Sequence, residues 1–411
     1  MTTALDRDLP PDVADLPAVL DWLARLRADA PVWRDRYGMH HVTRAADVEV
    51  VLRDTATFSS DFSAVMPEAQ QMSKGMLTRL DPPEHGALRH LVSRSFTPKR
   101  VAGLEPRIRE LTREMLPDAP GDVEGSTPIG QRSSTHRSVS FDLVDALAFP
   151  LPVTVIAEML GLPAADRGRF RQWADGLFSM QVEDPKEAVN DPAIRDAMGE
   201  ITGYLGDWCR ARRAAPTDDL ISALVTTEVD GRVLDDEEAA NFSMLLLFAG
   251  HITTTLLLGN AVRVLDEHPG AWDALRADPS AIPATVEEVL RLRPPFPMTA
   301  RATTRDVEIA GVTVPARSIV MPWLLSATHD PAAHPDPERF DPTRRGIGGG
   351  AQTAFGHGIH FCLGAPLARL EARVALEEMT ARYAGLTVGE GEQRPYTGRV
   401  LGTRRLPVVA T

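Results

Sequence analysis

The chain has 411 residues, of which 43% are hydrophobic and 6% aromatic, and its formal net charge is −13 at pH 7. This charge excludes a general nucleic-acid binder, which carries a basic face. The two cysteines, Cys209 and Cys362, exclude a disulfide scaffold. No basic segment followed by an apolar core opens the sequence, so we expect no signal peptide and a cytoplasmic protein.

Apolar residues recur three and four apart along most of the chain, which is typical of helices. The predicted helices span residues 16–27, 45–54, 83–95, 101–116, 151–160, 164–178, 194–213, 218–228, 235–266, 270–278, 283–292 and 367–384. Strand signals are short and few, at 41–43, 307–309, 312–314 and 319–321. The pattern predicts one mainly α domain over residues 1–411, with small β-sheets at one side. Residues 119–138 are rich in Gly, Ser, Thr and Pro and predict a mobile surface loop.

The predicted helix 235–266 contains an apolar run that is long enough to cross a bilayer. His251 and several threonines interrupt this run, and four acidic residues precede it. A helix that is apolar all round also suits the centre of a large soluble protein. We therefore expect a buried central helix and no membrane association.

Cys362 lies in a glycine-rich segment, and residues 355–366 read FGHGIHFCLGAP. Glycines let the backbone lie against a planar partner because they carry no side chain. A predicted helix begins just after Cys362, and backbone N–H groups at a helix start stabilise a thiolate. A lone, hydrogen-bonded thiolate is the ligand that a haem iron takes in one class of haem proteins.

Three other interpretations of Cys362 stay open at this point. A zinc or iron–sulfur site needs about four Cys or His ligands, and Cys209 is far away in the sequence. A nucleophilic Cys–His pair with His357 or His360 does not need so many glycines. A buried structural cysteine is the simplest alternative. Of the four interpretations, haem ligation explains most of the segment.

Further motifs accompany the cysteine segment. Glu288 and Arg291 form an ExxR pattern at a spacing that lets the two side chains meet on a helix. His85 and Arg89 lie one helical turn apart, and AGHITT occupies 249–254. Together, over residues 5–409, these motifs resemble the cytochrome P450 family, in its soluble bacterial class of natural-product tailoring enzymes.

The resemblance implies haem b as cofactor, with Cys362 as the proximal thiolate and metal ligand. It implies a buried structural network of Glu288, Arg291 and Arg339 behind the haem. His85, Arg89, Arg301 and His360 are then expected to hold the haem propionates, because buried carboxylates need cationic or N–H partners. The other expected haem-binding residues are Phe355, which packs near the sulfur, and Gly364.

The resemblance also implies a catalytic stretch in the central helix, formed by Ala249, Gly250, Thr253 and Thr254. Members of the family commonly carry an acid before the first threonine, and the two residues organise the water that supplies protons. Here Ile252 occupies the acid position. Three explanations stay open. Polar groups of the substrate complete the proton relay, or His251, Thr254 or a water chain completes it. In the third, the reaction is oxidative coupling or is supported by peroxide. We expect ordinary monooxygenation with an altered relay.

Substrate contacts are expected in an apolar pocket. Methionine suits an adaptable pocket, although it fills cores equally well. The candidate pocket residues are Met66, Met72, Met76, Met180, Ile252, Phe296, Met298 and Val400. The resemblance implies hydroxylation or epoxidation of an apolar polyketide, peptide or terpenoid metabolite, either free or tethered to a carrier protein.

No flavin or nicotinamide domain is recognisable, so the expected electron donors are a ferredoxin and its NAD(P)H-dependent reductase, with O2 as co-substrate. An acidic ferredoxin needs a local basic patch on the cysteine side. The candidates are Arg94, Lys99, Arg100, Arg344, Arg345, Arg369 and Arg373. We expect a monomer. A peroxygenase and a non-catalytic haem partner protein are the alternative functions.

Overall fold

The computed structural model describes residues 8–67, 74–93, 96–120, 138–178, 191–228, 231–344, 352–396 and 400–411. The α-helices are α1 (Leu16–Asp29), α2 (Ala45–Arg53), α3 (Glu84–Ser93), α4 (Pro98–Gly103), α5 (Glu105–Met115), α6 (Pro150–Leu160), α7 (Arg167–Phe178), α9 (Pro192–Ala214), α10 (Leu220–Thr226), α11 (Asp236–Glu267), α12 (Ala271–Ala277), α13 (Ile282–Leu292), α14 (Leu324–Thr328) and α15 (Ala365–Arg382). Shorter helical turns are η3 (Leu77–Arg79), η5 (Val144–Ala148), η6 (Ala164–Asp166), η7 (Pro279–Ala281) and η8 (Gly358–His360).

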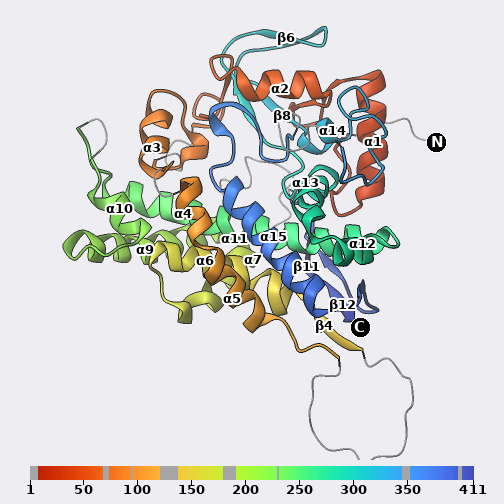
Figure 1. The fold of residues 1–411 in the computed structure, drawn as a ribbon. Coiled ribbons are helices and arrows are strands. Elements are labelled where there is room, and N and C mark those ends of the chain that lie inside the picture. Colours follow the sequence, from red (N-terminus) through yellow and green to blue (C-terminus); the bar gives the residue numbers. More distant parts are fainter. Residues whose placement is uncertain are drawn as a thin grey trace, which may run out of the picture.

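The strands are short and lie in several small sheets. They are β1 (Val32–Arg34), β2 (His40–Val42), β3 (Phe58–Ser59), β4 (Val139–Asp142), β5 (Arg301–Thr303), β6 (Val307–Ile309), β7 (Val312–Val314), β8 (Ile319–Pro322), β9 (Leu386–Val388), β10 (Arg394–Pro395), β11 (Thr403–Arg405) and β12 (Pro407–Ala410). The largest sheet has the order β1-β2-β8-β5-β3 and lies beside α1, α2 and α14 (Figure 1). A three-stranded sheet, β4-β12-β9, lies near the C-terminus.

Helix α11 runs through the middle of the molecule and packs against α6, α9 and α15 (Figure 1). A capping box starts it, in which Asp235 accepts from the backbone N–H of Glu238 while the Glu238 side chain accepts from the N–H of Asp235. Within the described ranges it is the one helix long and apolar enough to cross a membrane, and 78% of its most apolar window is buried. The predicted buried central helix is therefore confirmed.

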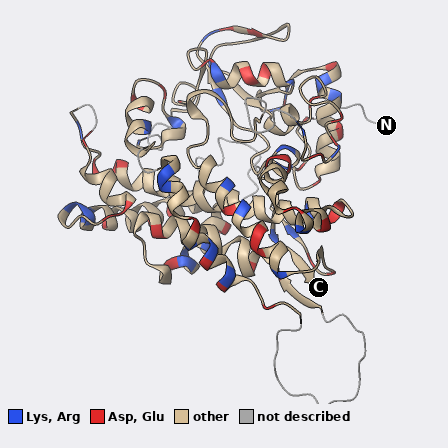
Figure 2. Cartoon of the chain, in the orientation of Figure 1, with Lys and Arg blue, Asp and Glu red and all other residues tan. Residues whose placement is uncertain are grey.

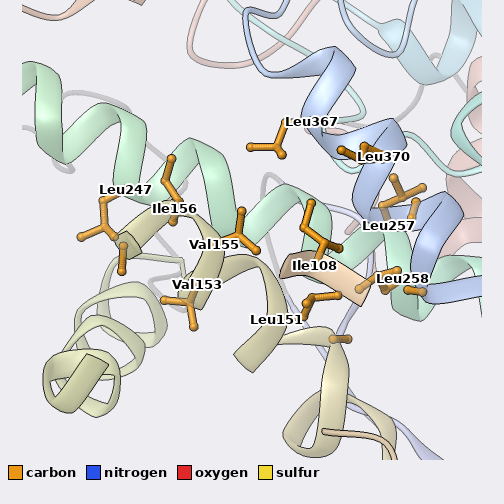
Figure 3. Close-up of a cluster of buried hydrophobic side chains, with 14 of the residues drawn as sticks. Ile108, Leu151, Val153, Val155, Ile156, Leu247, Leu257, Leu258, Leu367 and Leu370 are labelled. Atoms are coloured by element: carbon orange, nitrogen blue, oxygen red, sulfur yellow. The ribbon is translucent and has the colours of Figure 1, made fainter. Parts of the chain in front are cut away.

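Helix α11 approaches α6 closely at Gly250. Figure 3 draws Val155 and Ile156 of α6 and Leu247 of α11 among the side chains of one buried cluster, which also takes in Leu367 of α15. A Cβ on Gly250 would lie 2.8 Å from Cγ1 of Ile156. Because such a contact forces atoms apart, Gly250 is needed for the approach of the two helices.

Several boundaries differ from the sequence prediction. The single helix predicted over residues 101–116 is two helices, because Thr97 caps α4 and Pro106 fits the first turn of α5. The predicted strands 307–309 and 312–314 are confirmed as β6 and β7, which pair as a hairpin with Ala310 and Gly311 at positive φ in its turn. Most of the predicted loop 119–138 lies outside the described residues.

Candidate haem-thiolate site

Cys362 lies between η8 and the start of α15. Its backbone N–H donates to the carbonyl of Phe355 at 3.0 Å, which closes the glycine-rich segment into a loop. Burial of the sulfur raises the pKa of Cys362, while the N–H groups of Gly364 and Ala365 and the charge of Arg89 oppose this rise. The loop thus offers partners to a thiolate at the helix start, as the sequence predicts.

One glycine of the loop has a specific reason to be glycine. Gly358 has φ +71°, and a Cβ there would lie 2.9 Å from the carbonyl oxygen of Leu52 in α2. Glycine at this position therefore lets the loop rest on α2. A Cβ on Gly364 would lie 4.0 Å from the Cys362 sulfur, which is an ordinary van der Waals distance.

Three nitrogen-bearing side chains converge from separate elements: His85 from α3, Arg301 from β5 and His360 from η8. The imidazole centroids of His85 and His360 are 4.3 Å apart. Nε2 of His85 and Nε of Arg301 are buried, and neither has a hydrogen-bond partner among the described residues. Buried polar atoms without partners are rare in proteins. These donors fit the two carboxylates of a haem, which would occupy their free hydrogen-bonding capacity.

Electrostatics in this group supports the same assignment. Burial, together with the charges of Arg301, His85 and Arg89, lowers the pKa of His360 to about 3. Burial lowers the pKa of Arg301 to about 10. Several groups that can carry a positive charge therefore lie close together, and a ligand with two negative charges would reduce their mutual repulsion.

Ser60 is a member of this site that the sequence analysis missed. Its Oγ lies 2.9 Å from Nε2 of His360. In the tautomer with the proton on Nδ1, the Ser60 hydroxyl donates to Nε2, and Nδ1–H is left to donate to a carboxylate. Asp81 accepts from the backbone N–H of Ser60 at 3.0 Å and so positions the residue. No motif marks Ser60, because it lies 300 residues from its partner.

Arg89 has a different contact in this structure. Its Nη2 donates to the carbonyl oxygen of Phe361 at 2.6 Å, and burial lowers its pKa. The contact ties α3 directly to the residue before Cys362. Arg89 therefore stabilises the cysteine loop in addition to its predicted place in the haem-binding group.

The ExxR pair forms a buried network, as expected, but its third member differs. Arg291 donates to both carboxylate oxygens of Glu288, at 2.7 and 2.8 Å, and both side chains are fully buried. The predicted role of the Arg339 side chain is wrong: the side chain is exposed, and Arg339 contributes its carbonyl, which accepts from Arg291 at 3.2 Å. Arg344 is the second guanidinium at Glu288, at 3.3 Å. Backbone carbonyls in the 335–339 turn hold Arg344, which no short motif reveals.

The predicted catalytic stretch of α11 is held by hydrogen bonds from its threonine hydroxyls to its own backbone carbonyls. The Thr253 hydroxyl donates to the carbonyl of Ala249 at 2.8 Å, and Thr254 makes a longer contact of 3.5 Å with the carbonyl of Gly250. Such back-bonding loosens a helix locally. His251 is fully buried and faces Phe149, so it lies on a different side of α11 from Ala249 and Thr253.

Ile252 lies in an apolar cluster. It is 1% exposed and packs with Leu256, Tyr396 and Val400, with half-buried Phe296 against them. Three predicted pocket residues, Ile252, Phe296 and Val400, are thus brought together. The members of this cluster are apolar apart from the Tyr396 hydroxyl, which donates to Oδ1 of Asp175 in α7 at 3.3 Å.

The predicted methionines do not gather in one place. Met66 packs with Phe62 and Ala302, Met76 packs against the main core, and Met298 packs against a third cluster around Trp323. Met72 and Met180 lie outside the described residues. Methionine was therefore a weak signal for a shared pocket, because it fills gaps in any apolar cluster.

The predicted basic patch is largely neutralised. Arg369 pairs with Glu287, Arg373 pairs with Glu105 and Glu377, and Arg344 is taken up by the ExxR network. Figure 2 shows basic and acidic residues interspersed along α5 and α15. Lys99 and Arg100 on α4 are exposed, whereas Arg94 and Arg345 lie outside the described residues.

The two cysteines lie in different environments, since Cys209 is buried and Cys362 is only partly so. Among the described residues, no group of three or more His, Cys, Asp or Glu side chains could hold a metal ion. Cys209 is fully buried in α9, and burial raises the pKa of its thiol to about 11. It is a structural cysteine.

Comparisons with known proteins agree with the geometry. The family model of cytochrome P450 matches residues 193–407. The erythromycin C-12 hydroxylase of Saccharopolyspora erythraea is 56% identical over 405 residues, which cover 98% of this chain and 97% of that protein. The cyclomarin C epoxidase CymV of Salinispora arenicola is 40% identical over 374 residues, or 89% of each chain.

A solved structure gives the same result. The structure of a mutant of P450 EryK in complex with erythromycin B matches with a TM-score of 0.89 and 55% identity, covering 97% of this chain and 98% of that one. The chain belongs to the cytochrome P450 family. It is a haem b monooxygenase of the bacterial natural-product class, it has the P450 fold, and it inserts oxygen from O2 into a small-molecule secondary metabolite.

Proposed function

We propose that the substrate is a macrolide of the polyketide class and that the reaction is hydroxylation of one of its C–H bonds. The observation that carries this proposal is the 56% identity, over almost the whole of both chains, to an enzyme that hydroxylates erythromycin. The cyclomarin C epoxidase is 40% identical. An apolar substrate also suits the cluster of Ile252, Phe296 and Val400 beside the catalytic stretch.

When bound, haem with a thiolate ligand activates O2 for insertion of one oxygen atom into a C–H bond. The second oxygen atom leaves as water, and NAD(P)H supplies the electron pair. His85, Arg301 and His360 would hold the propionates, the loop around Cys362 would keep the sulfur in place, and the Ile252 cluster would line the substrate side. Thr253 is the hydroxyl nearest in sequence to Ile252, and it is held on the carbonyl of Ala249.

We further propose that a ferredoxin delivers the electrons one at a time to a cytoplasmic, monomeric enzyme. Lys99 and Arg100 are the exposed cations that we assign to its docking. They lie on α4, which contacts α15, the helix that follows Cys362. An acidic ferredoxin would meet them on this side.

The substrate proposal is tested by titrating the purified holoenzyme with erythromycin B, with a steroid of similar size as control. We expect the macrolide to shift the haem absorption at lower concentration than the steroid. Turnover with a surrogate ferredoxin, its reductase and O2 should then add one oxygen atom, as seen by mass spectrometry. Binding of the steroid alone, or of a carrier-tethered acyl chain alone, would overturn the proposal.

A further inference from the structure

Arg369 of α15 is held on two sides at once. Its Nε and Nη2 lie 2.5 and 3.0 Å from the two carboxylate oxygens of Glu287. Its Cζ lies 4.5 Å from the ring centroid of Phe355. A guanidinium that makes two parallel hydrogen bonds to a carboxylate and also stacks on an aromatic ring is fixed in its orientation.

Glu287 lies on α13, directly before Glu288 of the ExxR pair. Its side chain is 13% exposed. Its carbonyl oxygen accepts from Nε2 of Gln352 at 2.9 Å, and Oε1 of Gln352 accepts from the N–H of Ala354 at 3.2 Å. Two neighbouring glutamates therefore serve different networks: Glu288 binds Arg291, and Glu287 holds the start of the cysteine loop at two points.

The contact of Arg369 continues to the sulfur through Phe355. The carbonyl of Phe355 accepts from the backbone N–H of Cys362 at 3.0 Å. Phe355 thus contacts the Arg369 guanidinium with its ring and the Cys362 N–H with its backbone carbonyl.

We propose that Arg369 is a positioning residue for the thiolate, acting through Phe355, and that its pairing with Glu287 sets the reduction potential of the haem. The proposal replaces the ferredoxin-docking role that the sequence predicts for Arg369. A cation near the iron favours the reduced, less positive state. Loss of Arg369 therefore makes the potential more negative, whereas loss of the Glu287 charge leaves the cation unbalanced and makes it more positive.

The experiment measures the haem reduction potential of the holoenzyme by spectroelectrochemistry, without any redox partner. We expect Arg369→Gln to shift it downward and Glu287→Gln to shift it upward. Arg373→Gln is the matched control, because Arg373 lies one turn further along α15 and pairs with Glu105 and Glu377. Arg373→Gln removes the same positive charge as Arg369→Gln, and we expect a much smaller shift of the haem reduction potential.

A second readout separates positioning from charge. Arg369→Lys keeps the charge but loses the fork and the stack. We expect it to retain most of the potential, while a larger fraction of its carbon monoxide complex loses the thiolate absorption. Equal shifts in the Arg369→Gln and Arg373→Gln variants, shifts of the same sign for Arg369→Gln and Glu287→Gln, or an intact thiolate spectrum in Arg369→Lys would each overturn the proposal. Should Arg369→Gln not retain haem, Glu287→Gln and Arg369→Lys decide it.

Discussion

Glu288 and Arg291 are joined by two hydrogen bonds of 2.7 and 2.8 Å at a place where neither side chain is reached by solvent. The remaining N–H groups of Arg291 donate to the carbonyls of Thr328, Pro337 and Arg339. One guanidinium thus joins α13 to α14 and to the segment that leads toward the cysteine loop. A buried ion pair is tolerated only when its hydrogen bonds are satisfied in this way.

Removal of Arg291 is therefore expected to be severe. Arg291→Ala leaves the Glu288 charge buried, and we expect a loss of about 3–5 kcal/mol in the free energy of unfolding. Arg210→Ala is the control, since Arg210 and Asp207 form an exposed pair at the same i,i+3 spacing, for which about 0–1 kcal/mol is expected. Urea unfolding of the holoenzymes gives both values. Equal losses would show that the network contributes no more than a surface pair.

The haem-binding group makes a second prediction. Arg301→Leu removes a charged donor whose Nε has no protein partner among the described residues. A hydrogen bond to a charged group contributes about 1.5–3 kcal/mol, so haem should be lost about 10- to 100-fold faster. Transfer of haem to an acceptor protein measures this rate. Arg305→Leu is the control, because Arg305 donates to Thr57 instead. A rate equal to that of the control would remove Arg301 from the haem-binding group.

The amino-acid sequence predicted those parts of the fold and site that depend on local patterns. Periodicity found α11, and the glycine-rich run found Cys362, because both signals lie within a few turns of chain. The sequence could not show that Arg344, and not Arg339, is the second guanidinium at Glu288. This contact depends on the three-dimensional course of a turn, whose backbone carbonyls hold the Arg344 side chain. Ser60 was missed for a related reason, since its bond to His360 joins residues 300 positions apart.

Acid sensitivity is a third prediction. Burial lowers the pKa of His251 to about 4. In the unfolded chain this imidazole binds its proton at about pH 6.5. His251 therefore costs no stability above that pH. The free energy of unfolding falls as the pH drops from there toward the pKa of His251 in the folded protein. The loss is about 2–3 kcal/mol between about pH 6.5 and about pH 4.5.

His251→Leu removes this titration. We expect the free energy of unfolding of the variant to depend less steeply on pH below about 6.5. His90→Leu is the control, because His90 is exposed on α3. Unfolding in urea at a series of pH values measures the slopes. If the wild type and the His251→Leu variant had equal slopes, His251 would not be a source of the acid sensitivity.

Ferredoxin docking is the fourth prediction. Arg100→Glu reverses an exposed charge on α4, so reduction by an acidic ferredoxin should slow severalfold at low salt, and less at high salt, where charges are screened. Arg25→Glu on α1 is the control, since α1 lies away from α4 in Figure 1. Stopped-flow reduction by ferredoxin and by a small chemical reductant separates docking from chemistry. Slowing with both reductants would place the effect at the haem and not at a docking surface.

The substitution of Ile252 for an acid makes the last prediction. Ile252 is 1% exposed among Leu256, Tyr396 and Val400. A carboxyl introduced there would have a raised pKa because of burial, and would keep its proton near neutral pH. Ile252→Glu should therefore supply an acid beside Thr253, and we expect more product per NAD(P)H consumed than in Ile252→Gln, which has the same shape without the proton. Equal coupling in both variants and in the wild type would show that this position only fills space. The proton source would then lie on the substrate, in water or on another side chain, such as Asp175, which accepts from Tyr396. Peroxide-driven turnover bypasses the relay, so it would distinguish slow protonation from slow electron delivery.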